Sequence, residues 1–96
     1  MFERLFSRRR RQFRDIIISK PEQITVGFEM TTRRYYLSIV VPHRTAAREE
    51  YYRISRRMFH QFRGDWDLAR AFAAKCRRRQ MGYRLMVTLD RTSDGA

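Results

Sequence analysis

The feature that most constrains the fold is a strict alternation of apolar and polar residues between Gln23 and Val41. The apolar positions form two sets with a two-residue period, namely Ile24, Val26, Phe28 and Met30, then Tyr35, Leu37, Ile39 and Val41. This period is typical of half-buried strands. Folding the chain between Thr32 and Arg33 places Met30 opposite Tyr35 and Val26 opposite Ile39. The pattern therefore predicts a β-hairpin, and a four-residue loop over residues 31–34 would keep the same register.

Length and composition are those of one small folded domain. The chain has 96 residues, of which 43% are apolar and 14% aromatic, which is too apolar for intrinsic disorder. The single cysteine, Cys76, allows no internal disulfide and offers no metal-ligand spacing. No apolar run approaches the ~20 residues of a membrane span, and no secretory signal is present. We therefore expect a protein of a reducing compartment, cytoplasmic or nuclear, and not a secreted one.

The charge is the unusual part of the composition. Twenty-two basic residues stand against 10 acidic ones, which gives a net charge of +12, and only Lys20 and Lys75 are lysines. Arginine carries a planar fork of donors that fits phosphate and stacks on bases. A coding sequence rich in G and C is an alternative reason for arginine over lysine, but it does not explain the scarcity of acids. The excess therefore indicates a nucleic-acid partner.

The N-terminal segment, residues 1–14, combines aromatic residues at helical spacing with the run Arg8-Arg9-Arg10-Arg11. Three interpretations are open. The segment is a surface helix that docks Leu5, Phe6 and Phe13 onto the core, a basic arm that tracks phosphates, or an amphipathic helix that lies on an acidic membrane or serves as a presequence. In the fold that we expect, the segment is a basic N-terminal helix before the folded domain.

After Pro42 the apolar period changes from two to 3.6 residues. The positions that share one helical face are Ala47, Tyr51, Ile54, Met58 and Phe62. This spacing predicts a helix with Thr45 as its N-cap and Gly64 as its C′ residue. The opposite face would carry Arg53, Arg56, His60 and Arg63. That stripe is either the solvated side of the helix or a basic binding surface, since no acid lies between residues 51 and 63.

A second helix is expected to begin at Asp65 or Asp67, with Leu68, Phe72 and Cys76 on its buried face. Trp66 is expected to plug the core at the corner between the helices. The run Arg77-Arg78-Arg79 falls in the last turn, where positive charge complements the helix dipole. Gly82 then precedes a third alternating segment from Tyr83 to Leu89, which predicts another strand.

These elements predict an α+β fold with a small antiparallel or mixed sheet of three to four strands. Two consecutive helices would cover one face, and Ile16–Ile18 would add the fourth, edge strand. The expected organisation is a basic N-terminal segment (1–14), one α+β domain (15–91) and a polar tail (92–96). The open sheet face would show Thr25, Glu29, Thr31, Tyr36, Ser38, Arg84 and Thr88, with Val40 and Met86 as apolar exceptions. Open edges and outward apolar residues also suggest a homodimer.

The sequence contains none of the common catalytic or metal-binding motifs. It has no glycine-rich phosphate loop, no HExxH, no Cys/His metal set and no Gly-x-Ser-x-Gly. We therefore expect no cofactor and no enzyme activity. His60 beside Arg56 and Arg63 leaves a small basic ribonuclease as a minor alternative.

The function that follows is a small arginine-rich nucleic-acid-binding protein that contacts the phosphate backbone, RNA or DNA. RNA, including duplex RNA, is favoured because no DNA-binding motif is present. A viral or mobile-element protein that sequesters RNA would have such a composition. The alternative is an interaction protein that docks on an acidic membrane surface or protein partner through its N-terminal helix. The candidate binding residues are Arg8, Arg9, Arg10, Arg11, Arg53, Arg56, Arg63, Arg77, Arg78 and Arg79.

Overall fold

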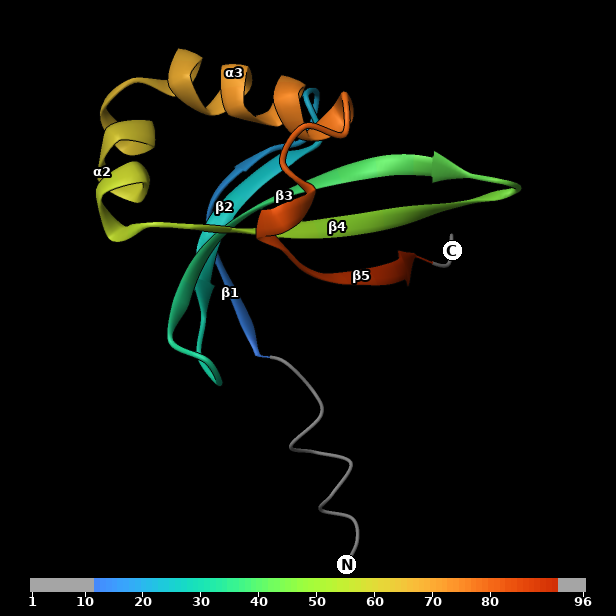
Figure 1. Cartoon of the computed structure of the whole chain (residues 1–96), viewed down its shortest axis with the longest axis horizontal. Coiled ribbons are helices and arrows are strands. Elements are labelled where there is room, and N and C mark those ends of the chain that lie inside the picture. Colours follow the sequence, from blue (N-terminus) through green and yellow to red (C-terminus); the bar gives the residue numbers. More distant parts are fainter. Residues whose placement is uncertain (1–11, 92–96) are drawn as a thin grey trace, which may run out of the picture.

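The computed structural model describes residues 12–91, which form one antiparallel sheet of five strands and two helices (Figure 1). The strands are β1 (Phe13–Ser19), β2 (Ile24–Glu29), β3 (Arg34–His43), β4 (Ala46–Ile54) and β5 (Leu85–Arg91). They lie side by side in chain order, so each pairs with its neighbour in sequence. Helices α2 (Arg56–Gly64) and α3 (Trp66–Arg77) and the short 3₁₀ helix η1 (Gly82–Arg84) connect β4 to β5.

The fold is α+β, but the prediction of a three- to four-stranded sheet is wrong because residues 46–54 form a strand and not the first half of a helix. β4 pairs with β3 along its whole length, from Ala46 opposite His43 to Ile54 opposite Tyr35. The apolar and aromatic residues there do not alternate with a period of two, and Ala47, Tyr51 and Ile54 fit a helical period of 3.6 residues. The ladder to β3 and burial on both faces favour the strand. Ser55, and not Thr45, is therefore the N-cap of the helix that follows.

The hairpin of β2 and β3 is present, but its predicted register is wrong by two residues. Phe28 lies opposite Tyr35, Val26 opposite Leu37 and Ile24 opposite Ile39. The turn consists of residues 30–33, so Met30 is a turn residue and Arg33 takes a left-handed backbone with φ 60°. The carboxylate of Glu29 accepts hydrogen bonds from the backbone N–H groups of Thr31 and Thr32, which fixes this turn. A shift of two residues leaves every side chain on its predicted face.

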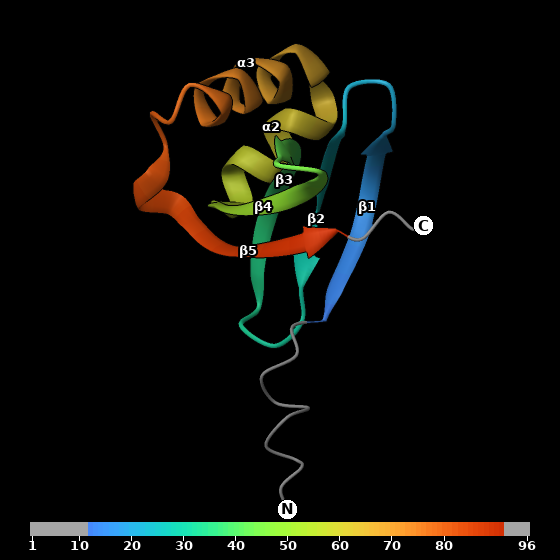
Figure 2. The same cartoon turned by 90° about the vertical axis from the view of Figure 1, so that its right-hand side faces the viewer.

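The main core lies between the sheet and the helices, which cover one sheet face (Figure 2). From the sheet it contains Ile24, Val26, Leu37, Ile39, Val41, Tyr52 and Ile54, and from the helices Phe59, Phe62, Ala69, Phe72, Ala73 and Cys76. Asp65 caps α3, as the sequence predicts, and Trp66 packs on the core at the corner. Leu68 departs from its predicted place because its side chain is exposed. Gly64 is the last residue of α2 and not a C′ residue beyond it.

The face of the sheet away from the helices is not the polar surface that the sequence suggests. Tyr36, Glu29 and Ser38 are all at most 1% exposed. Phe13 of β1 stacks on Tyr51 of β4 with ring centroids 3.9 Å apart, and its edge meets Tyr36. The hydroxyl of Ser38 donates to Glu49 and that of Tyr36 to Asp15, so these two buried hydroxyl groups are paired. A second, smaller aromatic cluster therefore closes over the middle of this face.

Both edges of the sheet carry exposed apolar side chains, Ile16 and Ile18 on β1 and Leu85 and Leu89 on β5. The predicted edge strand at Ile16–Ile18 is confirmed as part of β1. That strand begins at Phe13, so the last two positions of the predicted N-terminal helix are in a strand. The rest of that helix and the polar tail lie outside the described residues. Within residues 12–91, no helix has the length and apolarity to cross a membrane.

Candidate functional site

Most acidic side chains that the structure describes are held by a nearby arginine or a hydrogen bond. Ion pairs join Arg48 to Asp90 (3.0 Å), Arg79 to Glu50 (2.6 Å) and Arg91 to Glu49 (3.1 Å). Arg70 forms a further pair of contacts, to Glu22 and to Asp67. These four arginines are neutralised locally and contribute little free charge to the surface.

Two more arginines hold backbone groups. Arg77 donates to the carbonyl oxygens of Val40 (3.0 Å) and Glu22 (3.3 Å), and Arg84 donates to the carbonyl of Arg53 (3.1 Å). Of the predicted run Arg77-Arg78-Arg79, therefore, Arg77 and Arg79 bind the protein itself. Only Arg78 is exposed without such a contact among residues 12–91.

The arginines of residues 12–91 that make neither an ion pair nor a hydrogen bond with their side chains concentrate at one end of the molecule. Arg44 and Arg78 lie elsewhere, at the β3–β4 turn and after α3. The others, which we call the arginine cluster, are Arg14, Arg33, Arg34, Arg53, Arg56, Arg57 and Arg63. They come from β1, the β2–β3 turn, the start of β3, the end of β4 and helix α2. The charge is therefore not spread evenly over the surface.

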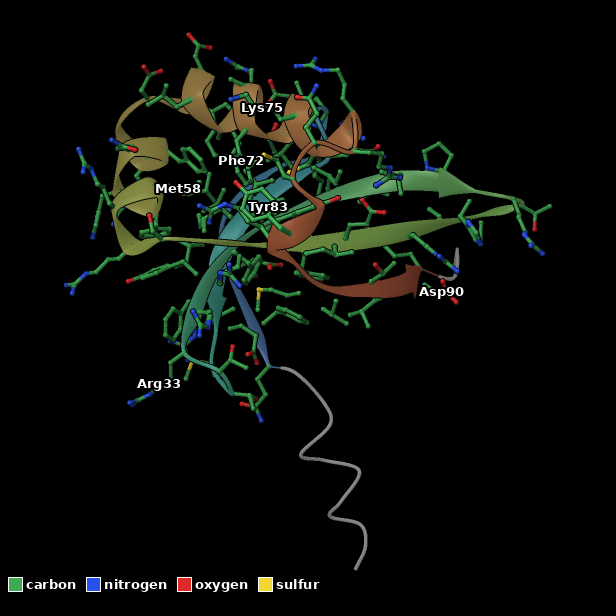
Figure 3. The ribbon with its side chains drawn as sticks, in the orientation of Figure 1. Arg33, Met58, Phe72, Lys75, Tyr83 and Asp90 are labelled. Atoms are coloured by element: carbon green, nitrogen blue, oxygen red, sulfur yellow. The ribbon has the colours of Figure 1, made fainter. Side chains whose placement is uncertain are left out.

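The sheet register explains why these segments meet. Tyr36 lies opposite Arg53 and Tyr35 opposite Ile54, so the next residues along the two strands, Arg34 and Ser55, reach the same end of the sheet. Helix α2 starts there, directly after Ser55. Figure 3 shows Arg33 at the tip of the β2–β3 hairpin, on the same side of the molecule as Met58 of α2.

Part of the predicted basic helix face is present on α2. Arg56, His60 and Arg63 recur at steps of four and three and are all exposed, while Phe59 and Phe62 are buried against the core. Arg53 does not belong to this helix face, because it is in β4. The serine cap orients the helix start, since Ser55 Oγ accepts a hydrogen bond from the backbone N–H of Met58 at 3.0 Å.

An open groove of about 380 Å³ is lined by two members of the arginine cluster, Arg14 and Arg63. It is lined by Arg14 and Ile16 of β1, Phe28, Met30 and Tyr35 of the hairpin, and Phe59, His60 and Arg63 of α2. Tyr35 stacks on Phe59 with centroids 4.3 Å apart and an interplanar angle of 24°, and Phe28 meets Tyr35 at 5.0 Å and 66°. The guanidinium of Arg63 lies over the Phe59 ring, 5.6 Å from its centroid.

Sequence reasoning found Arg56, Arg63 and His60 but missed the rest of the groove. Phe28 and Tyr35 occupy apolar positions of the alternating pattern, as core residues do. That pattern does not show that the helices leave these two side chains partly uncovered. The sequence pattern places Arg14 in an N-terminal helix and not in a strand. The available signal was Met30, an apolar residue next to the predicted turn, which is 41% exposed in the structure.

Nothing in the groove forms an acid–base pair. His60 is the one histidine there, and none of the lining side chains is a carboxylate. The thiol of Cys76 is buried elsewhere, and burial raises its pKa to about 12, which keeps it protonated. Among residues 12–91, no three His, Cys, Asp or Glu side chains are grouped closely enough to hold a metal ion. The groove can offer cations and ring faces to a ligand.

Comparisons with protein-family models, curated proteins and solved structures find no match for this chain. The predicted run Arg8, Arg9, Arg10 and Arg11 lies outside the described residues.

Proposed function

We propose that this protein binds nucleic acid chiefly through the phosphate backbone, using the arginine cluster at the α2 end of the sheet. The observation that carries the proposal is the distribution of free charge. Acids pair with Arg48, Arg70, Arg79 and Arg91, while the cluster makes no ion pair among residues 12–91. Uncompensated arginines cost stability through mutual repulsion, so their concentration at one site fits a polyanionic ligand that neutralises them.

Phosphate contacts of this kind give affinity with little sequence preference. RNA remains favoured over DNA, and the lone reduced cysteine fits the cytoplasm or nucleus. Arg8–Arg11 are further candidates for phosphate contacts, on the basis of their sequence alone. The second candidate is an acidic membrane surface or acidic protein bound through the N-terminal segment. That candidate does not require the arginines of α2.

The test compares two triple variants with the same change of charge. In the cluster variant, Arg56, Arg57 and Arg63 become Gln. In the control, Lys20, Arg44 and Lys75 become Gln, three exposed cations outside the cluster that make no ion pair among residues 12–91. Binding to single- and double-stranded RNA and DNA is measured by fluorescence anisotropy across a salt series, together with thermal melts.

We expect the cluster variant to bind every nucleic acid more weakly and to flatten the slope of log K against log salt by about 0.7 to 0.9 per lost contact, so roughly 2 to 3 in all. The control should change the slope much less. Equal effects of the two variants would mean that the charge acts only as a bulk property. Affinity of the wild type weaker than roughly 10⁻⁴ M for every nucleic acid would refute the proposal.

Two further measurements separate the alternatives. The first is binding to vesicles that contain anionic lipid. If replacing Arg8–Arg11 abolishes this binding and the cluster variant keeps it, the membrane-docking alternative is favoured. Shortening of a labelled RNA by the wild type, and not by a His60→Ala variant, would favour a ribonuclease.

A further inference from the structure

The groove that Arg14 and Arg63 help to line combines an apolar floor with free positive charge. Its floor is apolar and aromatic, with Phe28 and Tyr35 only partly buried and Phe59 stacked on Tyr35. Its lining also includes Arg14 from one strand and Arg63 from a helix, and neither forms an ion pair among residues 12–91. A ligand that satisfies both properties must present an apolar face and a negative charge.

The exposed apolar positions at the groove support a ligand rather than bare solvent. Ile16 is 45% and Met30 41% exposed, and both line the groove. Because they share this groove with aromatic side chains, they form a contiguous apolar patch, the kind of surface that marks a binding groove. Removing them from water would favour binding by the hydrophobic effect.

The aromatic geometry favours a flat ligand. Tyr35 and Phe59 already form a near-parallel stack, and Phe28 meets Tyr35 at a steep angle. These rings offer a planar group a stacking face or an edge. The volume of about 380 Å³ lies near the lower end of the roughly 300–1,000 Å³ of small-ligand sites. One nucleotide is a ligand of suitable size.

We propose that the groove holds one unpaired nucleotide, with its base against Phe28 and Tyr35 and its phosphate between Arg14 and Arg63. This inference rests on the proposed function and makes it narrower. A base inside a duplex is stacked on both faces, so a ring on the protein cannot reach it, whereas a single strand exposes each base. The protein would then prefer single-stranded over duplex nucleic acid.

The chain's own residues 1–11 are a less suitable occupant on grounds of charge. They carry five arginines, Arg4 and Arg8–Arg11, against the single acid Glu3. Arg14 and Arg63 would repel such a segment, and they would attract a phosphate. A second copy of the chain is strongly basic in the same way.

The experiment compares two single-stranded ligands of equal charge, a thymidine dodecamer and the same backbone with every base replaced by an abasic sugar. Affinities are measured by anisotropy at one salt concentration with the full chain. Stacking on one base predicts that the dodecamer binds roughly fivefold to 150-fold more tightly. A duplex of the same length should bind more weakly than the dodecamer.

The groove variant replaces Phe28 and Tyr35 with Leu, which keeps apolar volume and removes both rings. This variant should bind the thymidine dodecamer and the abasic strand with equal affinity. The matched control is Tyr83→Leu, since Tyr83 is 71% exposed, lies outside the groove and has Arg84 over its ring at 5.5 Å. Figure 3 shows Tyr83 well away from Arg33. The control should keep the full difference.

A second measurement uses the unaltered protein in case the groove variant does not fold. A single strand with 5-iodouracil is cross-linked by light, and the modified peptides are identified by mass spectrometry. We expect cross-links at Phe28, Tyr35 or His60. Cross-links confined to other segments, or a difference abolished by Tyr83→Leu, would overturn the assignment of the groove.

Failure of this inference is distinguishable from failure of the proposed function. If the dodecamer and the abasic strand bind measurably and equally, the groove does not hold a nucleotide, but phosphate binding stands. Tighter binding of the duplex than of the dodecamer would have the same meaning. If the groove holds residues 1–11 or a second copy, the groove variant alters the melt or the oligomeric state and leaves the ratio of affinities at one. No measurable binding of either strand contradicts both proposals.

Discussion

The Tyr36 hydroxyl donates a hydrogen bond to Asp15 Oδ1, with 2.5 Å between the oxygens, and the tyrosine ring lies over Gly27 of the strand between them. A Cβ atom at position 27 would stand 2.6 Å from that hydroxyl oxygen and 2.2 Å from the carbonyl oxygen of Arg14. Glycine is therefore required because two neighbours already occupy the space of a side chain. The absence of a side chain at Gly27 and the hydrogen bond to Asp15 let the fully buried Tyr36 lie flat on the sheet face away from the helices.

The first prediction follows from this contact. Gly27→Ala should destabilise the protein by about 3 kcal/mol, because the β1 backbone would have to move away from β2. Gly64→Ala is the matched control, since a Cβ there meets nothing within 4 Å. Chemical denaturation measures both. Equal stability of the two variants would show that the β1 backbone can move away from Gly27 at little cost in free energy.

The second prediction tests where the first helix begins. Ser55→Ala should cost about 1 kcal/mol, because the hydroxyl accepts the N–H of Met58. Thr45→Ala should change stability by less than about 0.5 kcal/mol, since Thr45 lies exposed in the β3–β4 turn. A larger loss at Thr45 than at Ser55 would support the long helix that the sequence pattern suggests.

The strands β2 and β3 could be predicted because both have one face toward the helices, so their apolar residues alternate. β4 could not be predicted in the same way. It buries Tyr52 and Ile54 toward the helices and Tyr51 on the other face, so its apolar residues do not alternate cleanly. The apolar residues of this segment also fit one face of a helix. The ladder to β3 decides between the two, and that ladder is a contact between distant segments.

The candidate site was predictable only where it lies on one element. The steps from Arg56 to His60 and Arg63 are visible in the sequence because a helix brings them to one face. The groove instead joins Arg14, Phe28 and Arg63 from three elements. Their proximity depends on the order of strands and on where α2 packs, which local periodicity does not contain.

The third prediction concerns acid. Hydrogen bonds from Arg70, Trp66 and Ser19 lower the pKa of Glu22 from 4.5 to about 2. For Glu29, burial alone would raise the pKa, but hydrogen bonds from Thr32, Thr31 and Gln12 outweigh it and again lower the pKa to about 2. A pKa that is lower in the folded state gives stability that is complete above pH 4.5 and is lost as the pH falls toward 2.

Glu22→Gln and Glu29→Gln should therefore each reduce the fall in melting temperature between pH 5 and pH 2 relative to the wild type. Thermal melts across that range give the measurement. The Gln variants should be less stable than the wild type at pH 7 and should approach it near pH 2. If the pH profile keeps its full slope in the double variant, other groups must govern acid unfolding.

The last prediction separates the core from the binding surface with two substitutions of neighbouring residues. Ile54 is 3% exposed at the end of β4, and Arg56 is exposed at the start of α2. An unpaired carboxylate at position 54 would cost several kcal/mol, a large part of the roughly 5–15 kcal/mol that stabilises a small domain, so Ile54→Asp should unfold the protein. Arg56→Asp should leave the melt unchanged or raise it slightly, because an acid at a helix start complements the dipole. Its affinity for single-stranded RNA should nevertheless fall about tenfold, a change of roughly 1.4 kcal/mol, since a positive charge in the cluster becomes negative. Circular dichroism melts and anisotropy titrations measure the two effects. An Arg56→Asp protein that binds RNA as tightly as the wild type would remove α2 from the binding surface.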